Sequence, residues 1–159
     1  MKTVKKRRLK RKTDYKSRLA LLKSEMPRLV VRKTNRYLIA QIVKTEISQD
    51  YVLLSKSTKD LLSLGWPIEK SGSLKNLNAA YALGFKIGTE AQKNKVKEVI
   101  LDFGMHRNKH KSRIYSLLKG ALDSGLKIEH SPNVLPSLDE INKNKELTEI
   151  VKKIIGGKN

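Results

Sequence analysis

Residues 28–47 read RLVVRKTNRYLIAQIVKTEI, and this stretch decides the fold. Two runs rich in β-branched and apolar residues, 28–34 and 36–47, are separated by Asn35, a residue that favours turns, so the stretch predicts a β-hairpin. After a further turn, a third such run, YVLLS at 51–55, extends the hairpin into an antiparallel meander. The first half of the chain is therefore expected to form a sheet.

Helical spacing of apolar residues appears before the meander, and turn signals follow it. Thr13 is the expected N-cap of a short helix with three apolar residues on one face, Tyr15, Leu19 and Leu22. After the meander, Ser57 or Thr58 is expected to cap a brief helix that ends before Gly65. Residues 68–75 (IEKSGSLK) are typical of a loop.

The second half of the chain is expected to alternate helix and strand. A helix with Gly84 and Gly88 on one face should lie very close to the sheet. KEVILDF at 97–103 indicates a buried strand, and 112–124 indicates a helix that Gly125 stops. A last short strand is expected at 126–128. These elements predict one mixed α/β (α+β) domain with a single sheet-and-helix layer pair, without an internal repeat and without a second core.

Three parts follow one another along the chain. Residues 1–12 form a basic arm, residues 13–130 the α/β domain, and residues 131–159 a C-terminal helical extension. Pro132 and Pro136 break the chain where the extension begins. Four apolar residues give the extension its helical spacing: Leu147, Ile150, Val151 and Ile154.

Composition favours an intracellular protein with a polyanionic partner. The chain holds 35 lysine and arginine residues against 15 acidic ones, a formal net charge of +20, which a partner is expected to compensate. The absence of cysteine excludes disulfides and thiolate metal sites. No apolar run reaches the ~18 residues of a membrane span, and no signal peptide follows the charged start. We therefore expect a soluble, cytoplasmic protein.

The first twelve residues, MKTVKKRRLKRK, hold eight cations and no acid. Such a segment has too little apolar area to offset the entropy of ordering, so we expect a solvated arm that awaits a polyanion. Nucleic acid is the favoured partner, because each cation that neutralises a phosphate releases condensed counterions. The alternative is a tail that only aids solubility.

Two further basic clusters lie in the body. At the hairpin, Arg32, Lys33 and Arg36 accompany Tyr37, which is able to stack on an RNA base. Alternation is expected to separate Arg32 from the packing residues Leu29, Val31 and Ile39. The alternative is that these charges merely protect an edge strand from aggregation.

The second basic cluster is the loop before the helix at 112–124, MHRNKHKSR at 105–113. Free N–H groups at a helix N-terminus favour phosphate. A metal site from His106 and His110 is disfavoured, because the neighbouring cations would repel the ion and no third ligand is near. His130 is expected at the surface.

Signals for chemistry are weak. Asp102, at the end of a buried strand, could serve a metal-dependent nuclease with Glu98 or Asp123 as its partner, but acids at strand ends commonly cap loops. No Walker-type glycine loop, no G-x-S-x-G motif and no zinc-ligand spacing is present. The sequence thus predicts no catalytic residue, no metal, no cofactor and no small-molecule substrate.

The run RKTNRYLIAQ at 32–41 resembles the basic hairpin motif of the large-subunit ribosomal protein family numbered eighteen, which binds 5S ribosomal RNA. Three further segments follow that family in the same order: KTDYKSRLALLKSEMPRLVVRKTN at 12–35, NLNAAYALG at 76–84 and VILDFGMHRNKHKSRIYSLLKGALDSGL at 99–126. The arm and the C-terminal extension resemble the archaeal and eukaryotic branch. One departure lies before the middle helix, where Lys75 and Asn78 replace a glycine-rich loop and a proline, so that region receives no RNA role by analogy.

The resemblance implies a structural, non-catalytic protein of the cytoplasmic ribosome. Its partners would be 5S rRNA, the large-subunit rRNA and neighbouring large-subunit proteins, and it would attach 5S rRNA to the large rRNA in the central protuberance. A metal-dependent RNA-processing nuclease remains the alternative. The residues expected to face RNA are Lys5, Lys6, Arg7, Arg8, Lys10, Arg11, Lys12, Arg18, Arg32, Lys33, Thr34, Asn35, Arg36, Tyr37, His106, Arg107, Lys109, Lys111 and Arg113.

Overall fold

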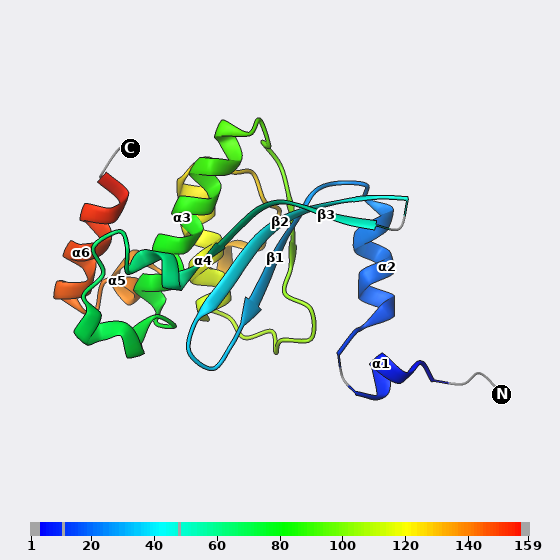
Figure 1. Ribbon diagram of the computed structural model, residues 1–159, viewed down its shortest axis with the longest axis horizontal. Helices are drawn as coiled ribbons and strands as arrows, with labels where there is room; N and C mark the ends of the chain where they lie inside the picture. Colours follow the sequence, from blue (N-terminus) through cyan, green and yellow to red (C-terminus); the bar gives the residue numbers. More distant parts are fainter. Residues whose placement is uncertain (1–3, 11, 48, 157–159) are drawn as a thin grey trace.

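The computed structural model describes residues 4–10, 12–47 and 49–156 of the chain (Figure 1). Helices and a four-stranded sheet make up this part of the chain, so the predicted mixed α/β class is confirmed. Within it, no helix is both long and apolar enough to cross a membrane.

The sheet has the strand order β3-β2-β1-β4. The strands β1 (Arg28–Lys33), β2 (Leu38–Glu46) and β3 (Gln49–Ser57) pair antiparallel in sequence order, which confirms the predicted meander. The fourth strand, β4 (Ile100–Asp102), is shorter than the run at 97–103 predicted and lies parallel to β1. The strand expected at 126–128 is reduced to one parallel bridge between Glu98 and Lys127.

The register of β1 and β2 decides which side chains enter the core. Val31 lies opposite Ala40, and both are buried. Arg32 lies opposite Ile39, which is only half-buried. Directly opposite residues of an antiparallel pair share a face. The expectation that Ile39 packs with Leu29 and Val31 is therefore wrong, since Ile39 shares the face of Arg32.

Two helices cover the core face of the sheet: α3 (Leu77–Lys93) and α4 (Arg113–Asp123). The glycine stripe of α3 does produce a close approach, but its partner is α4 rather than the sheet. A Cβ built on Gly84 would lie 1.9 Å from the Leu117 carbonyl oxygen, and one on Gly120 would lie 2.1 Å from that of Tyr81. Each helix therefore places a glycine against the backbone of the other, and the missing side chain allows the close approach. As predicted, Gly125 follows α4, with a φ of +95°.

The N-terminal segment begins with a short helical turn. Within the arm, residues Lys6–Leu9 form this turn (α1), which buries no side chain. The next helix, α2 (Tyr15–Lys23), is capped by Asp14 rather than Thr13, because the Asp14 carboxylate accepts a hydrogen bond from the Lys16 N–H at 3.1 Å. No residue of α2 is buried, so its expected apolar face has no core to join.

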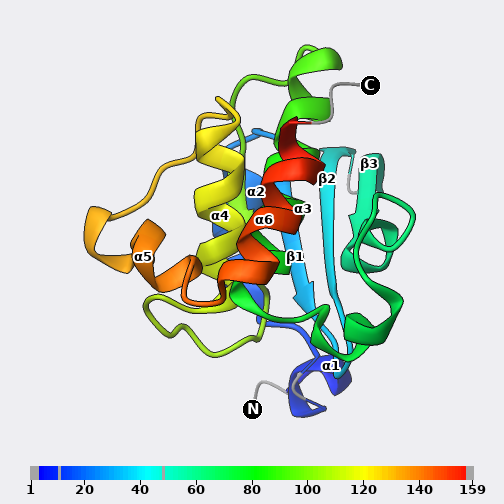
Figure 2. The same cartoon turned by 90° about the vertical axis from the view of Figure 1, so that its left-hand side faces the viewer.

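A second hydrophobic cluster corrects the prediction of a single core. It forms where η1 (Thr58–Leu61), the residues on either side of η2 (Ile68–Ser73) and α6 (Lys145–Gly156) pack on the side of α3 away from the sheet (Figures 1 and 2). The short helix α5 (Leu138–Ile141) precedes α6. Its buried residues are Leu61, Trp66, Leu74, Ala79, Ala82, Leu147, Val151 and Ile154. The helix α3 is apolar on two sides, and it therefore separates two cores.

The connection between the meander and α3 is more regular than a loop. The brief helix η1 begins at its predicted cap Ser57, which forms a reciprocal capping box with Asp60. Residues Ile68–Ser73, expected as a loop, form two 3-10 turns (η2) separated by a kink at Lys70, whose backbone is not helical. After α4, the short 3-10 helix η3 (Pro132–Val134) begins at the predicted break.

Candidate nucleic-acid interface

The turn between β1 and β2 is held by Thr34. Its N–H and its hydroxyl both donate to the Tyr37 carbonyl oxygen, at 2.9 and 2.7 Å, and the hydroxyl accepts from the Tyr37 N–H at 3.0 Å. Asn35 and Arg36, at the tip, are exposed. The Thr34 hydroxyl is therefore bonded within the turn, and the side chains exposed to solvent at the tip are those of Asn35 and Arg36.

The loop that precedes α4 lies against this hairpin. The Lys33 N–H, at the end of β1, donates to His106 Nε2 at 2.9 Å, across 73 positions of sequence. Further along the loop, the Tyr115 hydroxyl of α4 donates to Asn108 Oδ1 at 2.7 Å. The β1–β2 turn, this loop and α1 all lie on the lower side of the molecule in Figures 1 and 2. The fold thus brings the basic hairpin and the basic loop together.

His106 is a structural link in this arrangement. Its Nε2 accepts a hydrogen bond, so that nitrogen carries no proton. Burial lowers the pKa of His106 below its ordinary 6.5, and the nearby charges of Arg32 and Lys33 lower it further. The imidazole is therefore neutral at pH 7, and it fixes the loop rather than adding a positive charge to the surface.

We expect a pH-dependent contribution of His106 to stability. A histidine whose pKa is lower in the folded than in the unfolded chain stabilises the fold at pH above about 6.5, and this contribution is lost as the pH falls through the folded-state pKa. Urea unfolding between pH 7.5 and 5 should therefore show a loss of stability that His106→Ala lacks. Equal pH profiles for the two proteins would contradict the structural role of this imidazole.

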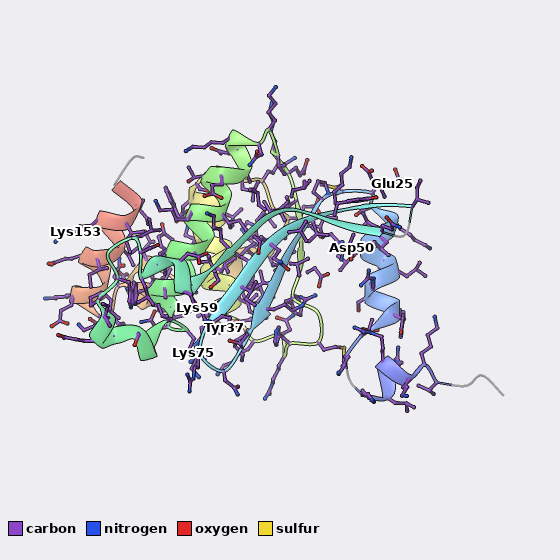
Figure 3. All side chains as sticks on the ribbon, viewed as in Figure 1. Glu25, Tyr37, Asp50, Lys59, Lys75 and Lys153 are labelled. Atoms are coloured by element: carbon purple, nitrogen blue, oxygen red, sulfur yellow. The ribbon has the colours of Figure 1, made fainter. Side chains whose placement is uncertain are left out.

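Two cations to which the sequence analysis gave no RNA role lie at the hairpin tip. The Lys59 ammonium lies 4.4 Å from the centre of the Tyr37 ring, and Lys75 Nζ donates to the Asn35 carbonyl oxygen at 2.7 Å. Figure 3 shows Tyr37, Lys59 and Lys75 gathered in one place. Lys75 lies 40 positions from Asn35, so only the tertiary fold reveals this neighbour.

A network of arginines and aspartates crosses the sheet below α2. Arg28, only 3% exposed, donates to Asp102 Oδ2 at 2.9 Å and to Asp50 Oδ1 at 2.8 Å. Arg32 pairs with Asp102 at 3.2 Å, and Arg18 of α2 pairs with Asp50 at 2.9 Å. Burial raises the pKa of Asp50, but the Thr45 hydroxyl and the charges of Arg28 and Arg18 outweigh it and hold the pKa below its ordinary value.

The geometry of Asp102 does not suit a nuclease. Its carboxylate is occupied by Arg28, Arg32 and the Gly104 N–H. Of its candidate partners, Glu98 pairs with Lys127 and Asp123 pairs with Lys119. Among residues 4–10, 12–47 and 49–156, no group of three histidine, cysteine or acidic residues is placed to hold a metal ion. Asp102 thus caps a strand end and neutralises buried arginine.

Comparison with known proteins assigns the chain to a family. Residues 1–96 and 85–131 match the family described as "Ribosomal large subunit proteins 60S L5, and 50S L18". The large ribosomal subunit protein uL18 of Korarchaeum cryptofilum is 46% identical over 135 residues, which cover 85% of this chain and 67% of that protein. The chain belongs to the uL18 family. The uL18 protein of Methanococcus maripaludis is 40% identical over 136 residues, covering 86% of this chain and 68% of the relative.

Membership of the uL18 family decides between the two functions that the sequence left open. The chain is a structural, non-enzymatic protein of the large ribosomal subunit, with rRNA and ribosomal proteins as its partners. The predicted place on the cytoplasmic ribosome is confirmed with the family. The nuclease alternative is wrong, and the occupied carboxylate of Asp102 agrees with that outcome.

The predicted RNA-facing residues of this uL18 chain fall into three groups. Exposed cations of the arm and the interface form the first: Lys6, Lys10, Lys12, Lys33, Arg36, Arg107 and Lys109. Side chains with partners inside the protein form the second: Lys5, Arg7, Arg8, Arg18, Arg32, Thr34, Tyr37, His106 and Lys111, whose ammonium pairs with Glu140 at 2.8 Å. The exposed Asn35 and the half-buried Arg113 complete the described set, and Arg11 lies outside the described residues.

Proposed function

We propose that this chain binds 5S rRNA and attaches it to the large-subunit rRNA in the central protuberance of the ribosome. Membership of the uL18 family supports a ribosomal role, and the formal charge of +20 supports an RNA partner. In this proposal, residues 1–12 are the arm, residues 13–130 bind the RNA, and residues 131–159 form an extension.

The observation that carries the proposal is the joining of two basic elements that are distant in sequence. The hydrogen bond between Lys33 and His106 places the hairpin tip beside the loop before α4. Exposed cations project from both elements, Lys33 and Arg36 from the hairpin, Arg107 and Lys109 from the loop. Because both elements are anchored, little ordering entropy is lost when phosphates bind there, which favours an RNA surface.

The remaining residues predicted to face RNA either add phosphate contacts or hold the surface in its shape. The arm adds a row of cations that pair with phosphates of the RNA backbone, and residues that bind within the protein, such as Arg32 and His106, hold the surface in shape. Lys59 and Lys75 extend the interface beyond the residues predicted from sequence. Backbone and shape contacts of this kind suit RNA, whose deep major groove is closed to side chains.

A pair of charge-matched variants tests the proposal. Lys33→Gln/Lys109→Gln removes two exposed lysines of the interface, whereas Lys152→Gln/Lys153→Gln removes two exposed lysines of α6, at the far end of the molecule (Figure 3). Binding to a 5S rRNA transcript is measured over a range of salt concentrations. We expect the interface pair to reduce the steepness of log affinity against log salt by about 1.4–1.8 units, since each of the two lost phosphate contacts contributes about 0.7–0.9. The α6 pair should leave the slope within experimental error of wild type.

Three results would count against the proposal. Failure of the wild-type chain to bind 5S rRNA more tightly than an unrelated structured RNA would remove the 5S assignment. Equal effects of the two lysine pairs would show that binding follows net charge and not this surface. If the chain binds a fragment of the large rRNA specifically but does not bind 5S rRNA, its RNA partner is the large rRNA instead.

Tyr37 gives a second prediction, independent of net charge. Its ring stands at the hairpin tip with the Lys59 ammonium 4.4 Å from its centre. We expect Tyr37→Ala to weaken 5S rRNA binding by about 1–3 kcal/mol, because the stacking surface is lost without a change of charge. Tyr37→Phe keeps the ring and should bind as wild type does. If the alanine variant binds as tightly as wild type while its thermal unfolding is unchanged, the ring serves only to position Lys59.

A further inference from the structure

A hollow separates α2 from the sheet. It has a volume of about 490 Å³ and lies between the arm and α2 on one side and the strand end at 101–105 on the other. The helix makes no buried contact there, and its Leu19 is 58% exposed. A nine-residue helix without a buried face has little stability of its own. Its described attachments are the Asp14 cap, the ion pair between Arg18 and Asp50 and the Lys5 ammonium 4.4 Å from the centre of the Tyr15 ring. None of these fills the space beneath the helix, which is open to a ligand.

The walls of the hollow combine positive charge with apolar surface. Arg7 and Lys12 line it from the arm, Arg32 from β1, and the apolar side chains of Leu21, Phe103 and Met105 complete it. Its two acids, Asp14 and Asp102, already pair with Arg8 and with Arg28 and Arg32. In the network beneath α2, three arginines (Arg18, Arg28 and Arg32) face two aspartates, which leaves one positive charge without a counter-charge among the described residues.

Arg32 is positioned in advance for an anion. Its described hydrogen bonds, to the carbonyl oxygens of Val31 and Asp102 and to Asp102 Oδ1, engage three of the five N–H groups of a guanidinium. The side chain is 40% exposed and lies against Gly104, where a Cβ would stand 3.0 Å from the guanidinium carbon. A fixed, planar guanidinium with spare donors is well suited to a phosphate or to the face of a base.

We propose that this hollow holds one unpaired nucleotide of the RNA. The phosphate takes the spare donors of Arg32 together with Arg7 and Lys12, and the base lies against Phe103 and Met105, beneath α2. A nucleotide supplies a negative phosphate for the cations of the hollow and a flat base for its apolar wall, whereas duplex backbone lacks an exposed base and an apolar peptide lacks the charge. This inference rests on the proposed binding of rRNA and specifies where a single-stranded position of that RNA enters the protein.

Filling the hollow is the direct test. Ala20 lines the hollow from α2 and is exposed, so Ala20→Trp fills the space without altering charge or core. Leu19→Trp places the same side chain on the adjacent position, which does not line the hollow. With a 5S rRNA transcript as the probe, we expect Ala20→Trp to weaken binding at least tenfold and Leu19→Trp to stay within about twofold of wild type.

The tryptophan at position 20 could weaken binding by displacing α2, so a second pair of variants changes the hollow from its other wall. Met105→Glu places a carboxylate at the half-exposed rim of the hollow, and Ile68→Glu makes the same change of charge at an exposed position outside it. Met105→Glu should weaken binding at least fivefold more than Ile68→Glu. The proposal is overturned if both hollow variants bind like their controls. If Lys33→Gln/Lys109→Gln still reduces the salt slope in that case, the proposed function stands and only the nucleotide site is lost.

Discussion

Replacing Arg28 with methionine is expected to lower the free energy of unfolding by about 3–5 kcal/mol. The guanidinium is almost fully buried and pairs with Asp102, whose side chain is only 8% exposed. Removal of Arg28 leaves the buried Asp102 carboxylate with only the more exposed Arg32 and the Gly104 N–H as partners. Loss of the buried partner of such a carboxylate costs several kcal/mol, which exceeds the value of the pair itself. Arg28→Met keeps much of the apolar stem, so the loss reports on charge rather than on a cavity.

Arg18→Met is the matched control within the same network. Arg18 pairs with Asp50 at the same kind of distance, 2.9 Å, but its side chain is 45% exposed. An exposed ion pair contributes about 0–1 kcal/mol, so this variant should lie within about 1 kcal/mol of wild type. Urea unfolding followed by circular dichroism measures both. Similar losses for the two variants would show that water reaches Arg28 and that the network is not buried.

The second large effect is expected at the crossing of α3 and α4. In Gly84→Ala the new methyl group would stand 1.9 Å from the Leu117 carbonyl oxygen, so the two helices must move apart. Alanine is favoured over glycine within a helix by about 1 kcal/mol, yet we expect a net loss of about 3 kcal/mol or more. The loss arises because the displaced helices carry the core residues between them and the sheet.

Gly72→Ala serves as the control for this substitution. A Cβ at Gly72 meets no atom within 4 Å, so its replacement should change stability by at most about 0.5 kcal/mol. Gly120→Ala, which would approach the Tyr81 carbonyl oxygen from α4, should resemble Gly84→Ala. Thermal and urea unfolding measure the stability of the three variants relative to wild type. A Gly84→Ala protein as stable as wild type would mean that the helices separate without cost.

Sequence alone determined the features that depend on neighbouring residues. Alternation and turn residues predicted the meander, Ser57 and Gly125 marked the ends of helices, and quoted motifs such as RKTNRYLIAQ indicated the family. These signals are local, because strand and helix periods, caps and turns are set by residues a few positions apart. The charge of the chain likewise needs no structure, and it pointed to RNA from the outset.

Tertiary structure decided which partners distant residues meet. The glycines of α3 predicted a close approach to another element, but only the fold shows that this element is α4. The residues next to Arg28 do not mark it as buried, and its charge is tolerated inside the protein because two aspartates, 22 and 74 positions away, pair with it. The second core and the contact of Lys75 with the hairpin tip arise in the same way. Such contacts depend on how whole elements pack, and a short window of sequence does not encode that packing.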